Sequence, residues 1–168
     1  MQQIRHTLDQ IMRVFNALTL GLMTLLTVWQ VFTRYLLHAP STWSEELASY
    51  MFAWVTMFGA AYVFGKREHM NIPVILERFS AKTQKALNLF SEALIFVFAI
   101  VVLIYGGIEI TSLTMGQMSS SLPLPMGYFY AVIPLSGIFI ALYSVLNMYD
   151  IYQKPLAAFD SAKKEEDN

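Results

Sequence analysis

The sequence has no cysteine among its 168 residues. This absence excludes disulfides, iron–sulfur clusters, c-type haem attachment and thiol–disulfide chemistry. Charged residues are also scarce, at 14% of the chain, and a net charge of −1 provides no overall field to attract nucleic acid, so no nucleic-acid partner is expected. The three histidines lie outside the long apolar runs. A haem bound between membrane helices needs axial ligands within those runs, so these histidines cannot supply them. No cofactor and no protein-bound metal are therefore expected.

Apolar residues are abundant instead, at 56% of the chain, which is too many for an ordinary soluble domain of this length. A helix that crosses the hydrocarbon core of a bilayer needs about 20 apolar residues. Four stretches meet this requirement, so we expect an all-α integral membrane domain over residues 1–155 and a flexible charged tail over residues 156–168. The first stretch is too long for a cleavable signal and should stay in the membrane. The predicted spans cover residues 14–37, 43–65, 86–109 and 125–149.

The boundary between the third and fourth spans is predicted from two prolines. Residues 110–149 contain no charged side chain and are too numerous for a single span. Pro123 and Pro125 have no backbone N–H and push the residues before them out of the helical region. The helix should therefore end before this segment and begin again near Pro125.

The distribution of basic residues predicts the topology. Ten of the 11 Lys and Arg residues lie in the amino-terminal end, the middle loop and the tail, and Arg34 is the exception. Because cytoplasmic segments are enriched in Lys and Arg, we expect both termini and the middle loop in the cytoplasm of a bacterial cell, with the chain in the inner membrane.

Two segments have apolar residues at helical spacing without being long enough to span. Residues 72–79 predict a short amphipathic interfacial helix in the cytoplasmic middle loop. Residues 4–15 show the same spacing, and two interpretations remain open for them. They form either a second interfacial helix or the solvated start of the first span.

Charged residues near the predicted spans are candidate functional positions. Glu92 is the one acid that lies away from the ends of a predicted span, and it has either a structural role near the inner interface or a contact with a partner subunit or ion path. Arg34, Glu45 and Glu46 share a depth on the outer side, which favours a salt bridge across the first hairpin or a contact with a partner. A local capping box from Thr42 to Glu45 is the competing interpretation. Adjacent carboxylates on a helix point about 100° apart, and with no nucleophile beside them we do not expect an enzyme.

Several short motifs, in their order and spacing, resemble the small membrane subunit (DctQ type) of tripartite ATP-independent periplasmic (TRAP) transporters. The resemblance covers nearly the whole chain, with one departure at Pro73, where family members often carry an acid. The motifs are Arg34, Trp43-Ser44-Glu45-Glu46-Leu47, Trp54, Gly59-Ala60, Glu68-His69-Met70-Asn71-Ile72, Leu122-Pro123-Leu124-Pro125 and Ile133-Pro134-Leu135.

The resemblance implies a function that composition does not show. Such a subunit pairs with a separate, large membrane subunit that carries the solute and sodium ions, while a periplasmic solute-binding protein delivers the solute. The small subunit is expected to be a scaffold in the bilayer, with sodium bound by the large partner and an organic anion (a dicarboxylate, another carboxylate or a sialic acid) as solute. The expected structural or subunit-interface residues are Arg34, Trp43, Glu45, Glu46, Gly59, His69, Glu92 and Pro134. The expected docking residues for the binding protein are His38, Ser41, Thr42, Gln117 and Ser119.

The residues of the predicted spans also bear on three other functions. A dimeric exporter would need a carboxylate deep in the first or second span, and a membrane redox enzyme would need Cys, His or clustered acids inside the bilayer. The predicted spans have neither feature. A small assembly or regulatory subunit of another membrane complex remains the alternative, because only the family resemblance separates it from a transporter subunit.

Overall fold

The structure is a computed structural model that describes residues 2–66 and 80–155. The predicted interfacial helix at residues 72–79, the candidate residue His69 and the tail at residues 156–168 lie outside the described residues. The described helices are α1 (Gln2–Tyr35), α2 (Thr42–Lys66), α4 (Ala81–Phe98), η1 (Ala99–Gly106), α5 (Gly107–Thr114), α6 (Gly127–Tyr130) and α7 (Val132–Gln153).

Four helical rods are long and apolar enough to cross a membrane. One rod combines α4, the π-helical segment η1 and α5 without interruption, and another combines α6 and α7. The predicted all-α fold with four membrane-spanning helices is therefore confirmed for the described residues. The rods are Arg5–Tyr35, Thr42–Lys66, Ala81–Thr114 and Gly127–Gln153.

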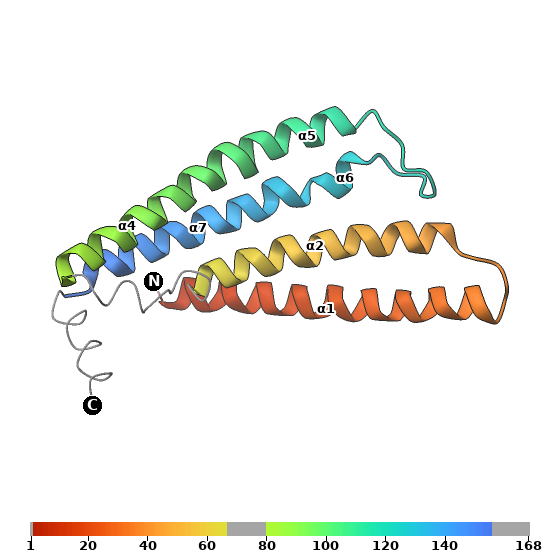
Figure 1. The fold of residues 1–168 in the computed structure, drawn as a ribbon, viewed down its shortest axis with the longest axis horizontal. Coiled ribbons are helices and arrows are strands. Elements are labelled where there is room, and N and C mark those ends of the chain that lie inside the picture. The colour runs from red at the N-terminus through yellow and green to blue at the C-terminus, as the bar shows by residue number, and fades with distance from the viewer. Residues whose placement is uncertain (1, 67–79, 156–168) are drawn as a thin grey trace.

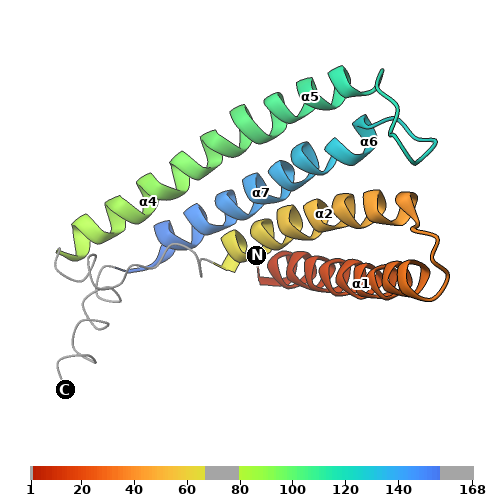
Figure 2. The ribbon, with the colours of Figure 1, turned by 45° about the vertical axis from the view of Figure 1, so that its right-hand side comes forward.

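The rods lie side by side in a single layer rather than in a closed bundle (Figures 1 and 2). Helix α1 packs on α2, α2 packs on α7, and α7 packs on the rod formed by α4, η1 and α5. Such a layer leaves two broad faces without a neighbour in the chain, and leucines of α1 such as Leu18 and Leu25 are accordingly exposed. At bilayer depth, exposed apolar side chains are suited to lipid tails or to another membrane protein.

The connections fall at two opposite ends of the layer (Figure 1). Residues 36–41 and 115–126 lie at one end, which we call the outer end, following the predicted topology. The start of α1, the end of α2, the start of α4 and the end of α7 lie at the other, called the inner end. Which end faces the cytoplasm stays a prediction.

Helix α1 decides between the two interpretations of residues 4–15. The helix runs unbroken from Gln2 to Tyr35, so these residues are the first turns of the first span. Met12 is only 1% exposed and packs with Phe58, Val132 and Tyr143 in the main apolar cluster. Leu8 and Phe15 pack against the same cluster, whereas Ile11 is exposed, so only part of the apolar spacing reflects packing within the chain.

Glycines occur where neighbouring rods approach most closely. A Cβ atom on Gly65 would lie 2.6 Å from ring atoms of Tyr143, and one on Gly107 would lie 2.8 Å from the backbone nitrogen of Pro134. Pro134 lies in the first turn of α7 and cannot donate a hydrogen bond to the carbonyl of Tyr130, where α6 ends. Gly107, which follows η1, and Pro134, in the first turn of α7, thus lie against each other.

Candidate functional site

Glu46 joins the start of α2 to the second outer loop. Its carboxylate oxygens accept hydrogen bonds from the backbone N–H of Ser121 at 2.8 Å, from the Tyr50 hydroxyl at 2.8 Å and from the Ser120 hydroxyl at 3.4 Å. Glu46 and Tyr50 are one helical turn apart, so they face the same neighbour. One carboxylate therefore connects α2 to a segment 75 residues further along the chain.

The loop that Glu46 holds is a small hairpin over residues 117–126, which we call the outer hairpin. Its arms are joined by two backbone hydrogen bonds, from the Ser119 N–H to the Leu124 carbonyl at 3.0 Å and from the Met126 N–H to the Gln117 carbonyl at 2.8 Å. The Ser119 hydroxyl accepts the Leu122 N–H at 3.3 Å and is largely buried. The predicted docking residue Ser119 is therefore occupied within the hairpin, whereas Gln117 is exposed.

The predicted salt bridge across the first hairpin is not formed among the described residues. Glu46 is directed to the outer hairpin instead, and both Arg34 and Glu45 are exposed. Helices α1 and α2 are joined here by Gln30, whose side-chain amide donates to the carbonyl of the buried Ser44 at 2.7 Å. Arg34 and Glu45 thus remain candidates for contact with a partner.

The start of α2 also differs from the predicted capping box. Helix α2 begins at Thr42, so the cap position falls on Ser41, one residue earlier than predicted. The Ser41 carbonyl accepts the backbone N–H and the hydroxyl of Ser44, at 3.2 and 2.8 Å. The Ser41 hydroxyl is buried without a hydrogen-bond partner in the described part of the chain. The first turn is therefore closed by backbone and Ser44 contacts rather than by Glu45.

A second polar cluster, at the inner end, was not predicted from the sequence. Arg5 of α1 forms an ion pair with Asp150 of α7 and donates to the side chain of Asn147 and to the Gly65 carbonyl, the last at 2.8 Å. The Tyr143 hydroxyl donates to Asp9 at 2.7 Å. This cluster, which we call the inner clasp, ties together the ends of α1, α2 and α7. One available signal was the spacing, because Arg5 and Asp9 lie one turn apart, as do Asn147 and Asp150.

Glu92 is a contact between α4 and α7. It is 5% exposed, and the Ser144 hydroxyl donates to its backbone carbonyl at 2.7 Å and to its side-chain Oε2 at 3.2 Å. A buried carboxylate in a span is costly unless it is hydrogen-bonded, so this contact favours the structural interpretation of the two that were open. A contact with a partner stays a prediction.

The remaining predicted positions lie apart from these contacts. Trp43 is 43% exposed, and Gly59 has nothing within 4 Å of the place where a Cβ would stand, so both face away from the chain's own packing. His38 has a positive φ of 50° and lies with Ser41 in the first outer connection, and Thr42 is the first residue of α2. That connection and the outer hairpin share one end of the layer (Figure 1), as the docking prediction requires.

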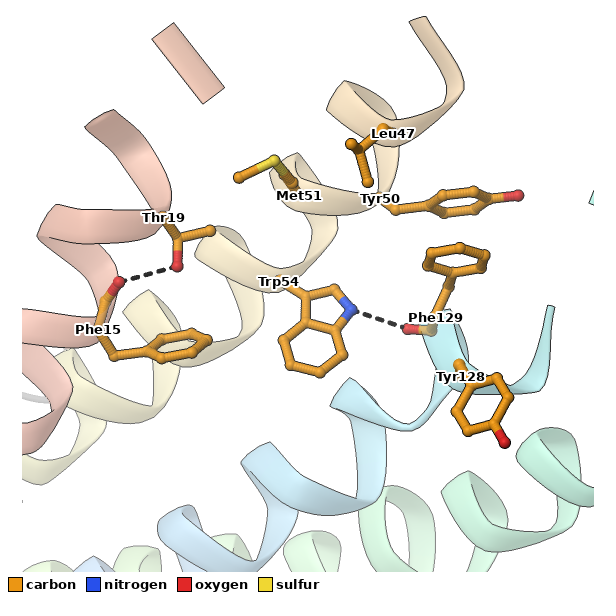
Figure 3. A pocket seen from close by; sticks show the side chains of 8 residues that line it. All are labelled: Phe15, Thr19, Leu47, Tyr50, Met51, Trp54, Tyr128 and Phe129. Carbon is orange, nitrogen blue, oxygen red and sulfur yellow. Dashed lines mark hydrogen bonds between the residues drawn. The ribbon is translucent and has the colours of Figure 1, made fainter. Parts of the chain in front are cut away.

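An apolar groove of about 380 Å³ opens between α1, α2 and α6 (Figure 3). Trp54 crosses it and donates its indole N–H to the Phe129 carbonyl at 3.1 Å, while the rings of Tyr50 and Phe129 stack 3.7 Å apart. No charged side chain lines the groove, and the described residues contain no group of three or more His, Asp or Glu placed to hold a metal ion. The lining residues are Phe15, Thr19, Leu47, Tyr50, Met51, Trp54, Tyr128 and Phe129.

Together, these features define a multi-pass membrane protein in which Arg5, Asp150 and Glu92 join the chain's own helices. Comparison with known proteins identifies the family. Residues 23–154 match the family of tripartite ATP-independent periplasmic transporters, DctQ component, and the chain belongs to that family. It is therefore a small permease subunit in the inner membrane, a transport protein and not an enzyme, whose partners are a large permease subunit and a periplasmic binding protein.

Individual relatives are named for different solutes. The chain is 26% identical to a sialic acid TRAP transporter small permease protein (SiaQ) of Vibrio cholerae, over 96% of this chain and 93% of the relative. It is 32% identical to a C4-dicarboxylate TRAP transporter small permease protein (DctQ) of the same organism, over 57% of this chain and 41% of the relative. A sialic acid TRAP transporter permease protein (SiaT) of Haemophilus influenzae is 37% identical over 40% of this chain and 11% of its own length.

Proposed function

We propose that this chain is the scaffold subunit of a sodium-driven importer of an organic carboxylate. The large partner subunit binds and moves both the solute and the sodium ions. The relatives named for sialic acid and for C4-dicarboxylates support the solute class, because both kinds of solute are carboxylate anions.

The single-layer arrangement is the observation that carries this proposal. A membrane protein that moves an ion or a polar solute needs polar groups around a path, often at broken helices near the bilayer midplane. Here Glu46 and Glu92 are hydrogen-bonded to the chain itself, and the groove beside Trp54 is apolar. The two open faces of the layer supply lateral surface for a larger partner instead.

The outer end of the layer is proposed to receive the periplasmic binding protein. The exposed residues Gln117 and His38 lie on its two connections, and Thr42, also exposed, begins α2 beside them. With both termini in the cytoplasm, these connections face the periplasm. Sodium ions are proposed to bind the large subunit and not this chain.

The test is reconstitution with a large permease subunit and a periplasmic binding protein from the same organism. The two membrane subunits should copurify in detergent and, in proteoliposomes, should take up a labelled sialic acid or C4-dicarboxylate only with a sodium gradient and the binding protein present. Vesicles with either membrane subunit alone are the control. If the large subunit alone transports at the full rate, or if this chain copurifies with a different membrane complex, the proposal is wrong.

A further inference from the structure

Glu46, which is half-buried, is a tether that holds in place a segment that has little structure of its own. The outer hairpin has only two backbone hydrogen bonds between its arms, and two of its residues, Pro123 and Pro125, have no N–H to contribute. A two-stranded hairpin is marginally stable at best without packing against something else. Its position therefore depends on what holds it.

The tether acts on the tip of the hairpin. The Glu46 carboxylate accepts the Ser121 N–H at 2.8 Å and the Ser120 hydroxyl at 3.4 Å. Hydrogen bonds to an ionised group are about twice as strong as neutral ones. The carboxylate is itself oriented by the Tyr50 hydroxyl. Its place in the early turns of α2, where the helix dipole favours negative charge, stabilises the ionised form.

The base of the hairpin is held by the same turn of α2. The Tyr50 ring stacks on Phe129 with the ring planes 8° apart, and Phe129 lies three residues after the hairpin ends, in α6. Trp54, one turn further along α2, donates to the Phe129 carbonyl. Tip and base are thus fixed to one face of α2, and the side chains of Met118 and Leu124 remain exposed, at 62% and 45%.

From this geometry we infer that Glu46 is a positioning residue that holds the outer hairpin in the orientation in which it receives the periplasmic binding protein. The inference rests on the proposed docking of that protein at the outer end. A docking element that is held in its bound orientation loses less conformational entropy on binding. Without the tether, only a fraction of molecules presents the hairpin correctly, and apparent affinity falls by that fraction.

The experiment titrates the binding protein against proteoliposomes that contain the complex of this chain with its large subunit. Initial uptake rates give the binding-protein concentration for half-maximal transport and the maximal rate. Glu46→Ala should raise the half-maximal concentration about tenfold, as expected if about one molecule in ten presents the hairpin correctly, with the maximal rate and complex yield near wild type. Glu46→Gln keeps a hydrogen-bond acceptor without the charge and should raise the half-maximal concentration about threefold.

Two further variants keep the test decisive. Tyr50→Phe keeps the stacked ring but removes the hydroxyl that orients Glu46, so it should shift the half-maximal concentration in the same direction by about twofold. Glu109→Gln neutralises an exposed carboxylate of α5, the last segment of its rod before the outer end, and should leave the half-maximal concentration unchanged. Should Glu46→Ala not assemble, Glu46→Gln and Tyr50→Phe decide the question by the same criterion.

Two results would overturn the inference. One is a half-maximal concentration that stays at the wild-type value in the Glu46 and Tyr50 variants. The other is a fall in complex yield or maximal rate with no change in that concentration, which would mark Glu46 as a purely structural residue. A wild-type complex that transports without the binding protein would instead contradict the proposed function, so the two failures are distinguishable.

Discussion

The contact between Gly65 of α2 and Tyr143 of α7 provides the sharpest test of the packing. The Cβ of a Gly65→Ala variant would lie 2.6–2.7 Å from three ring atoms of Tyr143, well inside van der Waals contact. The ring has no room to move, because Tyr143 is 0% exposed and its hydroxyl is bonded to Asp9 at 2.7 Å. Relief of the clash therefore requires α2 and α7 to separate.

The expected destabilisation has two parts. Overpacking a well-packed core by one methyl group costs about 1–3 kcal/mol. Moving Tyr143 or α2 also weakens the bond to Asp9 and the bond from Arg5 to the Gly65 carbonyl, and hydrogen bonds to charged groups are worth about 1.5–3 kcal/mol. A total of about 3 kcal/mol would lower the melting temperature by about 6–12 °C for a chain of this length.

Thermal unfolding of the purified chain in mild detergent, followed by far-UV circular dichroism, measures this effect. Gly59→Ala is the matched control on the same helix, because a Cβ there meets nothing within 4 Å and alanine is favoured over glycine in a helix interior by up to about 1 kcal/mol. It should melt at or slightly above wild type. Adding Tyr143→Leu to Gly65→Ala should cost less than the sum of the single changes.

The reasoning fails if Gly65→Ala melts at or above the wild-type temperature, or if the double variant is fully additive. Either result would mean that α2 and α7 do not approach as closely as the structure shows. Gly59→Ala carries a second readout, because Gly59 is predicted at a subunit interface. A variant that is stable alone but no longer copurifies with the large subunit would support that prediction.

Three further outcomes follow from the contacts and the topology. Arg5→Ala should destabilise the purified chain by about 2 kcal/mol because the inner clasp loses its central donor. Arg5→Lys should restore only part of this stability, since a single ammonium group cannot reproduce the several N–H donors of the guanidinium. Equal melting temperatures for wild type and Arg5→Ala would contradict the clasp. Trp54→Phe keeps an aromatic ring in the groove but loses the bond to the Phe129 carbonyl, so it should cost about 1 kcal/mol in the same assay, and an unchanged melting temperature would argue against that bond. Because the chain has no native cysteine, Ser120→Cys should react with a membrane-impermeant maleimide in spheroplasts and Thr83→Cys only after permeabilisation, and the reverse pattern would invert the topology.

Much of the fold was determined by the sequence alone, because insertion into a bilayer depends on local composition. Length and hydropathy set the number of spans, since each apolar run must cross about 30 Å of hydrocarbon by itself. The break near Pro123 and Pro125 was predictable because proline acts on its own backbone neighbours. The helices indeed end at Thr114 and resume at Gly127. The family, too, was evident from short motifs, and the match over residues 23–154 confirms it.

Only the tertiary structure decided how the spans lie beside one another and which polar groups meet. Hydropathy is the same for a helix at the edge of a layer and one at its centre, so the central place of α7 was not readable from it. Arg5 and Asp150 are 145 positions apart, and Glu46 and Ser121 are 75 apart. Sequence reasoning paired Glu46 with its near neighbour Arg34, because charge and depth matched. The structure pairs Glu46 with the outer hairpin instead. Because α7 packs on α2, the loop that leads into α6 and α7 lies beside the start of α2, where Glu46 stands.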